Sequence, residues 1–154
     1  MQSGAPAAPA TQQGYEAQQG ATDGREVHRW VVTTLMNAGY RCNEDTPTHC
    51  MTADDQWIVE VATRVEPDRT LIMLDSMWPR AADKQCAQYN GQMTALTSQP
   101  DWFNVSCNDS SARFRMNTTL IYNTQLDMPA WMEQHRKSRY AAYTQLAASG
   151  GLQR

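Results

Sequence analysis

Four cysteines are the residues whose type and spacing most restrict the chemistry of this sequence. Cys42 and Cys50 flank a short acidic loop, and Cys86 and Cys107 lie farther along the chain. A structural zinc site usually has two close cysteine pairs and a thiol-exchange centre has C-x-x-C, and the sequence contains neither pattern. His49 beside Cys50 is a candidate metal ligand, but a lone histidine in a polar loop is usually only solvated. Metal binding and redox chemistry are therefore the less favoured interpretations.

Two disulfide bonds are the interpretation that the positions favour. Cys42 and Cys50 lie at the inner ends of two short strand segments, so a hairpin brings them together. Cys86 faces the core from a predicted helix, and Cys107 faces it from the strand that follows. The sequence predicts the pairs Cys42–Cys50 and Cys86–Cys107, each stabilising the fold by about 2 to 4 kcal/mol. Disulfides indicate an oxidising compartment, and free buried cysteines, Cys86 in particular, are the alternative.

The remaining nucleophiles and bases do not form a recognised catalytic pattern. His28, His49 and His135 fall in a helix, a loop and another helix. The sequence has no G-x-S-x-G turn, no H-E-x-x-H helix and no glycine-rich phosphate loop. We therefore predict a protein that is not an enzyme, with no catalytic residue, no metal and no cofactor.

Acidic residues occur in two settings that need a structural or a functional explanation. Glu44-Asp45 and Asp54-Asp55 lack the spacing of an EF-hand, so a solvated hairpin rim is favoured over a calcium site. Asp75 interrupts the apolar run LIMLDSMW and needs a partner if it is buried. A structural pairing with an arginine is favoured there over a functional carboxylate.

Basic residues supply the candidate interaction surface. HRKSR, residues 135–139, is a small cluster on a predicted helix that can dock an acidic partner or anionic lipid headgroups, although an exposed helix face is the simpler interpretation. Two further arginines point outward from a predicted strand. The formal net charge of −3 argues against general nucleic-acid binding. The candidate surface residues are Arg136, Lys137, Arg139, Arg113 and Arg115.

Hydrophobic periodicity predicts an α+β protein with a single antiparallel sheet packed by helices. A first helix is predicted over residues 24–38, and Gly39 indicates its end. A second helix is predicted over residues 80–97, where apolar residues recur every three or four positions. Asp127 caps the last helix, whose Pro129 falls in the first turn. The predicted order is one helix, a four-strand antiparallel meander, a helix, a two-strand hairpin and a helix.

Alternation and helical spacing also predict which side chains are buried. The returning strand of the second hairpin places Phe114, Met116, Thr118, Leu120 and Tyr122 inward, so that its arginines point outward. One side of the last helix is marked by Met128, Trp131, Met132, His135, Arg139, Ala142 and Leu146.

The chain of 154 residues is long enough for one domain with a single core. We expect a disordered Ala/Pro/Gln-rich leader over 1–22, a single α+β domain over 23–149 and a flexible tail over 150–154. Such a leader often follows the processing site of an exported bacterial protein or lipoprotein. We therefore expect a periplasmic or secreted protein whose signal segment has been removed, with membrane contact only through a lost lipid anchor. A cytoplasmic protein with an unstructured start is the alternative.

With this element order, the chain resembles the bacterial YbjN-like family, which shares the type III secretion chaperone-like fold. The resemblance covers about residues 23–147. It rests on LMNAGYRC, on the long hairpin WIVEVATRV with RTLIMLDSMWP, on the second hairpin WFNVSCNDSSARFRMNTTLIY and on LDMPAWMEQHRKS at the last helix. It implies a non-enzymatic protein associated with regulation or stress responses. Relatives of this fold bind partner proteins and often dimerise, whereas the four cysteines and the export-like leader depart from a cytoplasmic chaperone.

A well-patterned fold without a catalytic constellation favours a non-catalytic exported bacterial protein of YbjN-like type. It would act as a protein-interaction, chaperone-like or regulatory module, with a protein partner or a second copy of itself in a homodimer. One alternative is a small-ligand-binding protein or an uncharacterised enzyme whose cleft is lined by Asp75, the tryptophans and His135. Another is a thiol- or metal-dependent sensor.

Overall fold

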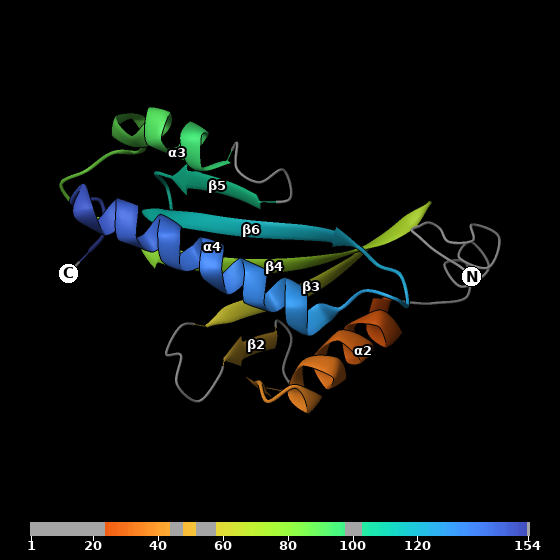
Figure 1. The fold of residues 1–154 in the computed structure, drawn as a ribbon. Helices are drawn as coiled ribbons and strands as arrows, with labels where there is room; N and C mark the ends of the chain where they lie inside the picture. The colour runs from red at the N-terminus through yellow and green to blue at the C-terminus, as the bar shows by residue number, and fades with distance from the viewer. Residues whose placement is uncertain (1–23, 44–47, 52–57, 98–102, 154) are drawn as a thin grey trace.

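The computed structural model describes residues 24–43, 48–51, 58–97 and 103–153, so the predicted leader lies outside the described residues. In the described part, six strands form one antiparallel sheet in the order β1-β2-β3-β4-β6-β5, with helices along one side (Figure 1). The predicted α+β class and the single sheet are confirmed. The elements are α2 (Gly24–Asn37), β1 (Arg41–Cys42), β2 (Thr48–Met51), β3 (Val59–Glu66), β4 (Arg69–Pro79), η1 (Cys86–Tyr89), α3 (Asn90–Thr97), β5 (Phe103–Asn108), β6 (Arg113–Ile121) and α4 (Met128–Ala148).

The first helix ends at the glycine that the sequence indicates. Gly39 has a φ of +102°, a left-handed conformation that costs glycine little. The amides of Gly39 and Tyr40 donate to the carbonyls of Met36 and Leu35, at 3.0 and 3.1 Å. These two bonds form a Schellman motif, which satisfies carbonyl groups at the end of α2.

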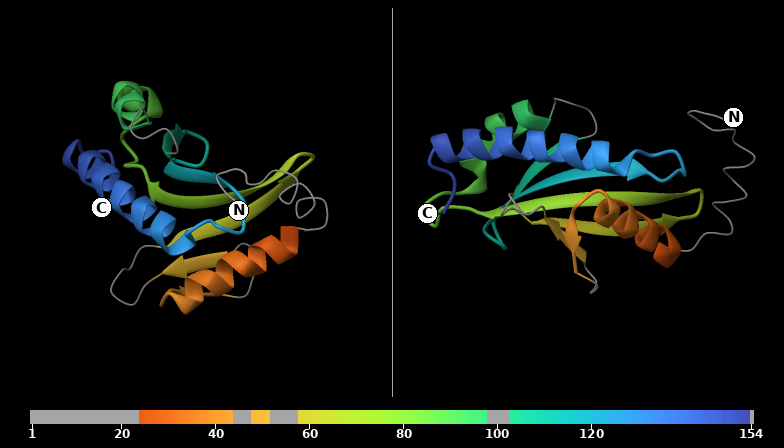
Figure 2. Two further views of the ribbon diagram at one scale, coloured as in Figure 1. Left: turned by 45° about the vertical axis from the view of Figure 1, so that its right-hand side comes forward. Right: turned by 60° about the horizontal axis from the view of Figure 1, so that its bottom comes forward.

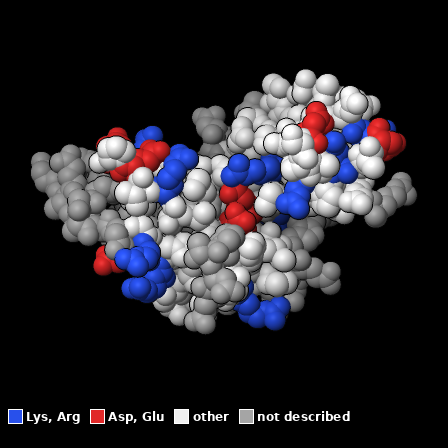
Figure 3. Space-filling model, turned by 180° about the vertical axis from the view of Figure 1, so that it is seen from behind, with Lys and Arg blue, Asp and Glu red and all other residues white. Residues whose placement is uncertain are grey.

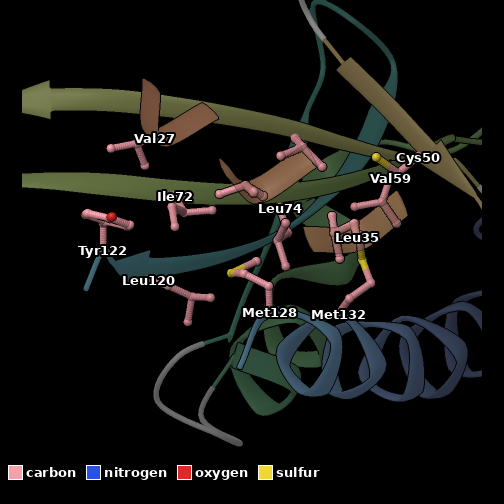
Figure 4. Close-up of a cluster of buried hydrophobic side chains, with 12 residues drawn as sticks. Val27, Leu35, Cys50, Val59, Ile72, Leu74, Leu120, Tyr122, Met128 and Met132 are labelled. Carbon is pink, nitrogen blue, oxygen red and sulfur yellow. The ribbon is translucent and has the colours of Figure 1, made fainter. Parts of the chain in front are cut away.

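Two clusters of buried side chains join the helices to the sheet. The first lies between α2, the start of α4 and the strands, and includes Leu35, Leu74 and Met132 (Figure 4). The second lies nearer the far end of α4 and includes Phe114, whose ring packs edge-on against Tyr89 at a centroid distance of 5.3 Å. Burial of this apolar surface is the main favourable contribution to folding.

The second helix is shorter than predicted. The sequence indicates a helix over 80–97, but Arg80 instead forms an isolated bridge with Leu152, and the helical part begins with the 3-10 turn η1. Asp109 explains this start, because its Oδ1 accepts a hydrogen bond from the Cys86 amide at 3.0 Å and lies 3.3 Å from Arg80 Nη2. Tertiary contacts therefore keep residues 80–85 out of a helix where local periodicity favours one.

The last helix begins as predicted. Asp127 accepts a hydrogen bond from the Ala130 amide at 3.1 Å, and proline occupies the first turn. The buried side matches the predicted one except that Trp131 is only partly buried. The buried residues of α4 are Met128, Met132, His135, Arg139, Ala142 and Leu146.

Residues after α4 return to the sheet. The Ala81 amide donates to the Gly151 carbonyl at 2.8 Å, and the Gln153 amide donates to the Pro79 carbonyl at 3.0 Å. The segment over 150–154 is expected to be a flexible tail, but as far as residue 153 it is hydrogen-bonded to the end of β4 and to the residues that follow it. No described helix is long and apolar enough to cross a membrane.

The sheet has one covered and one open face. α2, α3 and α4 all lie on the same side of the strands, as the two turned views show (Figure 2). Because side chains alternate along a strand, every second residue of the sheet points away from these helices. This helix-free side is called the open sheet face below.

Candidate functional site

A row of polar side chains crosses the open sheet face from β2 to β5. The strand pairings place His49 opposite Glu60, Glu60 opposite Asp75, Asp75 opposite Asn117, and Asn117 opposite Asn104. Directly opposed residues on one face have neighbouring side chains, so these five form a continuous polar row. The row brings together residues that are far apart in the sequence.

Asp75 is the buried centre of this row. It is only 4% exposed, and its Oδ1 accepts hydrogen bonds from Arg115 Nε at 3.0 Å and from Asn117 Nδ2 at 2.8 Å. Arg115 Nη2 also lies 2.9 Å from the same oxygen, so the expected arginine partner is confirmed. Thr119 donates to Asn117 Oδ1 at 2.6 Å and fixes the amide. The hydrogen bond to Asp75 raises the pKa of Arg115, which therefore stays charged.

Two carboxylates face each other in the row. Glu60 and Asp75 are directly opposite on β3 and β4, an arrangement that repulsion alone would disfavour. His49 Nε2 lies 3.5 Å from Glu60, and the Glu60 charge also acts on Arg115. The guanidinium of Arg115, which interacts with both carboxylates, therefore offsets the repulsion.

Exposed apolar side chains flank the polar row. Met77 is 40% exposed and lies two residues after Asp75 on β4, and Ile121 is 48% exposed and lies four residues after Asn117 on β6, so both point to the open sheet face. Seen from behind, acidic side chains lie beside basic ones near the middle of the molecule (Figure 3). The open sheet face thus combines a fixed charged centre with apolar contacts, and protein interfaces commonly have this composition.

The basic residues considered from the sequence do not form one surface. Arg113 and Arg115 lie on β6 and point to the open sheet face, whereas Arg136 and Lys137 are exposed on α4, on the covered side. Arg136 also pairs with Glu133 three residues before it. The prediction that Arg139 belongs to an accessible surface is wrong, because Arg139 is only 1% exposed. Its helical position puts it among the buried residues of α4.

His135 lies on the other face of the sheet from Asp75. Its Nε2 is 3.0 Å from Ser76 Oγ and its Nδ1 is 2.8 Å from Thr118 Oγ1, with no exposed surface. Burial, with a smaller contribution from Arg139, lowers the pKa of His135 to about 3, so the ring is neutral. The Ser76–His135 contact resembles a nucleophile–base pair, but no substrate can reach it. A cleft lined by both Asp75 and His135 is therefore not formed.

The cysteines form the two pairs that the sequence predicts. Cys42 is joined to Cys50 and Cys86 to Cys107, and none is free. The first bond links directly opposed residues of β1 and β2, and the second links η1 to β5. A sensor based on free thiols has no thiol to use in this state. Among the described residues, no three His, Cys, Asp or Glu side chains are placed to hold a metal ion.

Sequence reasoning identified Asp75 and Arg115 but not the polar row that joins them to Glu60 and Asn117. Glu60 and Asn117 are outward-facing residues of alternating strands, and that pattern was the available signal. The row itself depends on which strands pair, and in particular on β6 lying between β4 and β5. Local patterns do not determine this order.

Comparisons with known proteins identify a similar fold but no sequence family. No protein-family model matches the chain, and no curated protein matches it in sequence. A crystal structure of YbjN from E. coli, described as a proposed transcription regulator, matches with a TM-score of 0.63 over 82% of this chain and 95% of that one, at 11% sequence identity. The chain therefore has a YbjN-like fold, as the sequence resemblance predicts.

Proposed function

We propose that the protein is a non-catalytic interaction module that binds another protein through the open sheet face. The observation that carries this proposal is the exposure of Met77 and Ile121 on a sheet face that no described helix covers. Antiparallel sheets often leave one face in water, but that face is then mostly polar. Exposed methionine and isoleucine beside a rigid charged centre favour contact with a macromolecule.

The fixed centre of this face supports recognition of a specific partner. Arg115 and Asn117 hold Asp75 in one position, so little side-chain entropy is lost there when a partner binds. Arg113 and Glu60 add exposed or half-exposed charges of both signs, which select a partner of matching charge pattern. A second copy of the chain and a different protein are both partners of this kind.

The likeness to YbjN supports the fold and the non-enzymatic role but not a DNA-binding one. The regulatory role stated for YbjN belongs to that protein. Here the formal net charge is −3, and the basic residues of the open sheet face are interleaved with carboxylates. Phosphate backbones favour a continuous basic surface, so we propose no nucleic-acid partner.

We also propose that the protein works outside the cytoplasm. Two disulfides in a chain of this size are typical of oxidising compartments, and both cysteine pairs are joined. For a bacterial protein, the periplasm and the exterior are such compartments. An interaction role in the envelope therefore fits the chemistry of the cysteines.

Site-specific photo-crosslinking in the native host tests the interaction. A photoreactive amino acid is placed at Met77 or at Ile121, and at Lys137 on the exposed side of α4 as the matched control. We expect the two sheet positions to give a discrete adduct, with another protein or with a second copy, and Lys137 to give none. Adducts of equal yield at all three positions, or none at any, would contradict the proposal.

The double variant Met77→Glu/Ile121→Glu provides the energetic test. Both side chains are about half exposed, so the fold should tolerate the change, and an unchanged circular dichroism spectrum checks this. Burial of two such side chains in an interface contributes enough that complex formation should fall more than tenfold. An unchanged yield of complex would show that the open sheet face is not the interface.

A further inference from the structure

A groove runs along one flank of α2, away from the open sheet face. It has a volume of about 1140 Å³, and its walls come from α2, from β1 and β2, and from the middle of β3. Small-molecule sites commonly have volumes of this order. Local sequence patterns give no signal for this groove.

The helical wall of the groove is basic at one end and apolar at the other. Arg25 and Arg29 lie one turn apart near the start of α2, and Val32 and Met36 follow on the same side of the helix. Met36 lies about three turns beyond Arg25, which is about 16 Å along the helix axis. Met36 is 51% exposed, so the apolar end is open to a ligand.

The opposite wall supplies polar groups but no acidic side chain. Thr48 and Thr63 line it, and Thr48 Oγ1 holds His28 Nε2 at 2.7 Å. Among the described residues that line the groove, none is Asp or Glu. Among the lining residues that the structure describes, a negatively charged group that enters therefore meets arginines and no carboxylate.

The two arginines are available for such a group. The ion pairs found among the described residues involve other basic side chains and include neither Arg25 nor Arg29. Both side chains are exposed, and they sit near the N-terminal end of α2, where the helix dipole also favours negative charge. Within the described part of the chain, their shared flank is thus a basic site without an ion-pairing carboxylate, beside an apolar stripe.

We propose that this groove binds an anionic amphiphile, a molecule with a carboxylate or phosphate head and a single apolar chain. The head lies between Arg25 and Arg29, and the chain follows the helix over Val32 to Met36. Charge complementarity selects the head, and the order of basic and apolar residues sets the direction of the chain. The 16 Å span selects a chain of medium length.

Calorimetric titration with fatty-acid anions tests the proposal on the full chain. Monomeric dodecanoate is the probe, and dodecyltrimethylammonium, with the same chain and the opposite charge, is the control ligand. We expect dodecanoate to bind and the cation to bind at least tenfold more weakly. From octanoate to dodecanoate the affinity should rise about fourfold per methylene group, as burial of each CH₂ predicts, and then level off once the chain outgrows the groove.

Paired variants locate the site. Arg25→Gln/Arg29→Gln should weaken dodecanoate binding roughly tenfold, whereas Arg113→Gln/Lys137→Gln, which removes the same charge elsewhere, should leave it unchanged. Met36→Gln should reduce the gain in affinity per methylene group of the ligand, whereas Ile121→Gln on the open sheet face should leave this gain unchanged. All replaced side chains are exposed, so unchanged melting temperatures are expected and exclude unfolding as the cause.

Other results would overturn the proposal. If dodecyltrimethylammonium binds as tightly as dodecanoate, or if both double variants lose the same affinity for dodecanoate, then Arg25 and Arg29 do not bind the head group. Tight binding of an acidic peptide with no dependence on fatty-acid chain length would indicate a protein segment instead. Binding to phosphatidylglycerol vesicles without binding to monomeric dodecanoate would indicate a membrane surface. Because Met77 and Ile121 take no part here, the interaction proposal and this one fail independently.

Discussion

The buried histidine predicts how the stability of the fold depends on pH. His135 has no exposed surface and is held between Ser76 and Thr118, which suit a neutral ring with one donor and one acceptor nitrogen. Its pKa is lowered from 6.5 to about 3, mainly by burial and further by the nearby Arg139. In the unfolded chain the ring takes up a proton near its ordinary pKa.

The sign and the size of the effect follow from these two values. Above about pH 6.5 the ring is neutral in both states and has no effect on the pH dependence. Below that pH the unfolded state binds a proton that the folded state excludes until about pH 3, so stability falls as the pH falls. At pH 5 the solution lies about 1.5 pH units below the ordinary histidine pKa of 6.5. The unfolding free energy is therefore lowered by about 2 kcal/mol.

Urea denaturation at pH 7 and at pH 5 measures this loss. The variant His135→Gln is less stable at both values, but its loss between them should be smaller than that of the unchanged protein by about 2 kcal/mol. His49→Gln, which removes a half-exposed histidine from the opposite face, is the matched control and should keep most of the original loss. If His135→Gln and the unchanged protein lose the same free energy, the ring is not buried in the neutral form.

Three further predictions concern the stability of the fold. Replacing Cys86 and Cys107 together by alanine opens a loop of sequence separation 21 and should lower the unfolding free energy by about 3 kcal/mol, measured by urea denaturation without reductant. If the double variant is as stable as the unchanged protein, this bond does not constrain the unfolded chain. Arg115→Ala leaves the buried Asp75 without its cation and should cost about 2 kcal/mol, most of which the added change Asp75→Asn should restore; no restoration would argue against a charge effect. Gly39→Ala forces a left-handed conformation on alanine and should lower stability by about 1 kcal/mol, and a neutral result in thermal melts would refute the role of φ.

The elements and the cysteine pairs could be predicted because their signals are local. Gly39 marks the end of α2, and Asp127 with its proline marks the start of α4. Alternation placed Cys107 and Phe114 on the core side of their strands, where one is partly and the other fully buried. Pairing Cys86 with Cys107 needed only that both face the same core.

The remaining features depend on contacts that a local pattern does not contain. The non-helical chain around Arg80 results from its contacts with Asp109 and Leu152, which lie far along the sequence. Helical spacing correctly placed Arg139 beside core residues, but its charge suggested the surface, and only the packing decides between them. The groove beside α2 likewise needs the position of the helix against β3.

The bond between Cys42 and Cys50 has a consequence for the border of the sheet. β1 and β2 have only two and four residues, too few for their own ladder bonds to hold them firmly. If the bond were reduced, this border would fray and leave β3 as the outermost strand, with unpaired amides and carbonyls ready to join another chain. By keeping the Cys42–Cys50 bond oxidised, an oxidising environment therefore limits aggregation through the edge of β3 as well as unfolding.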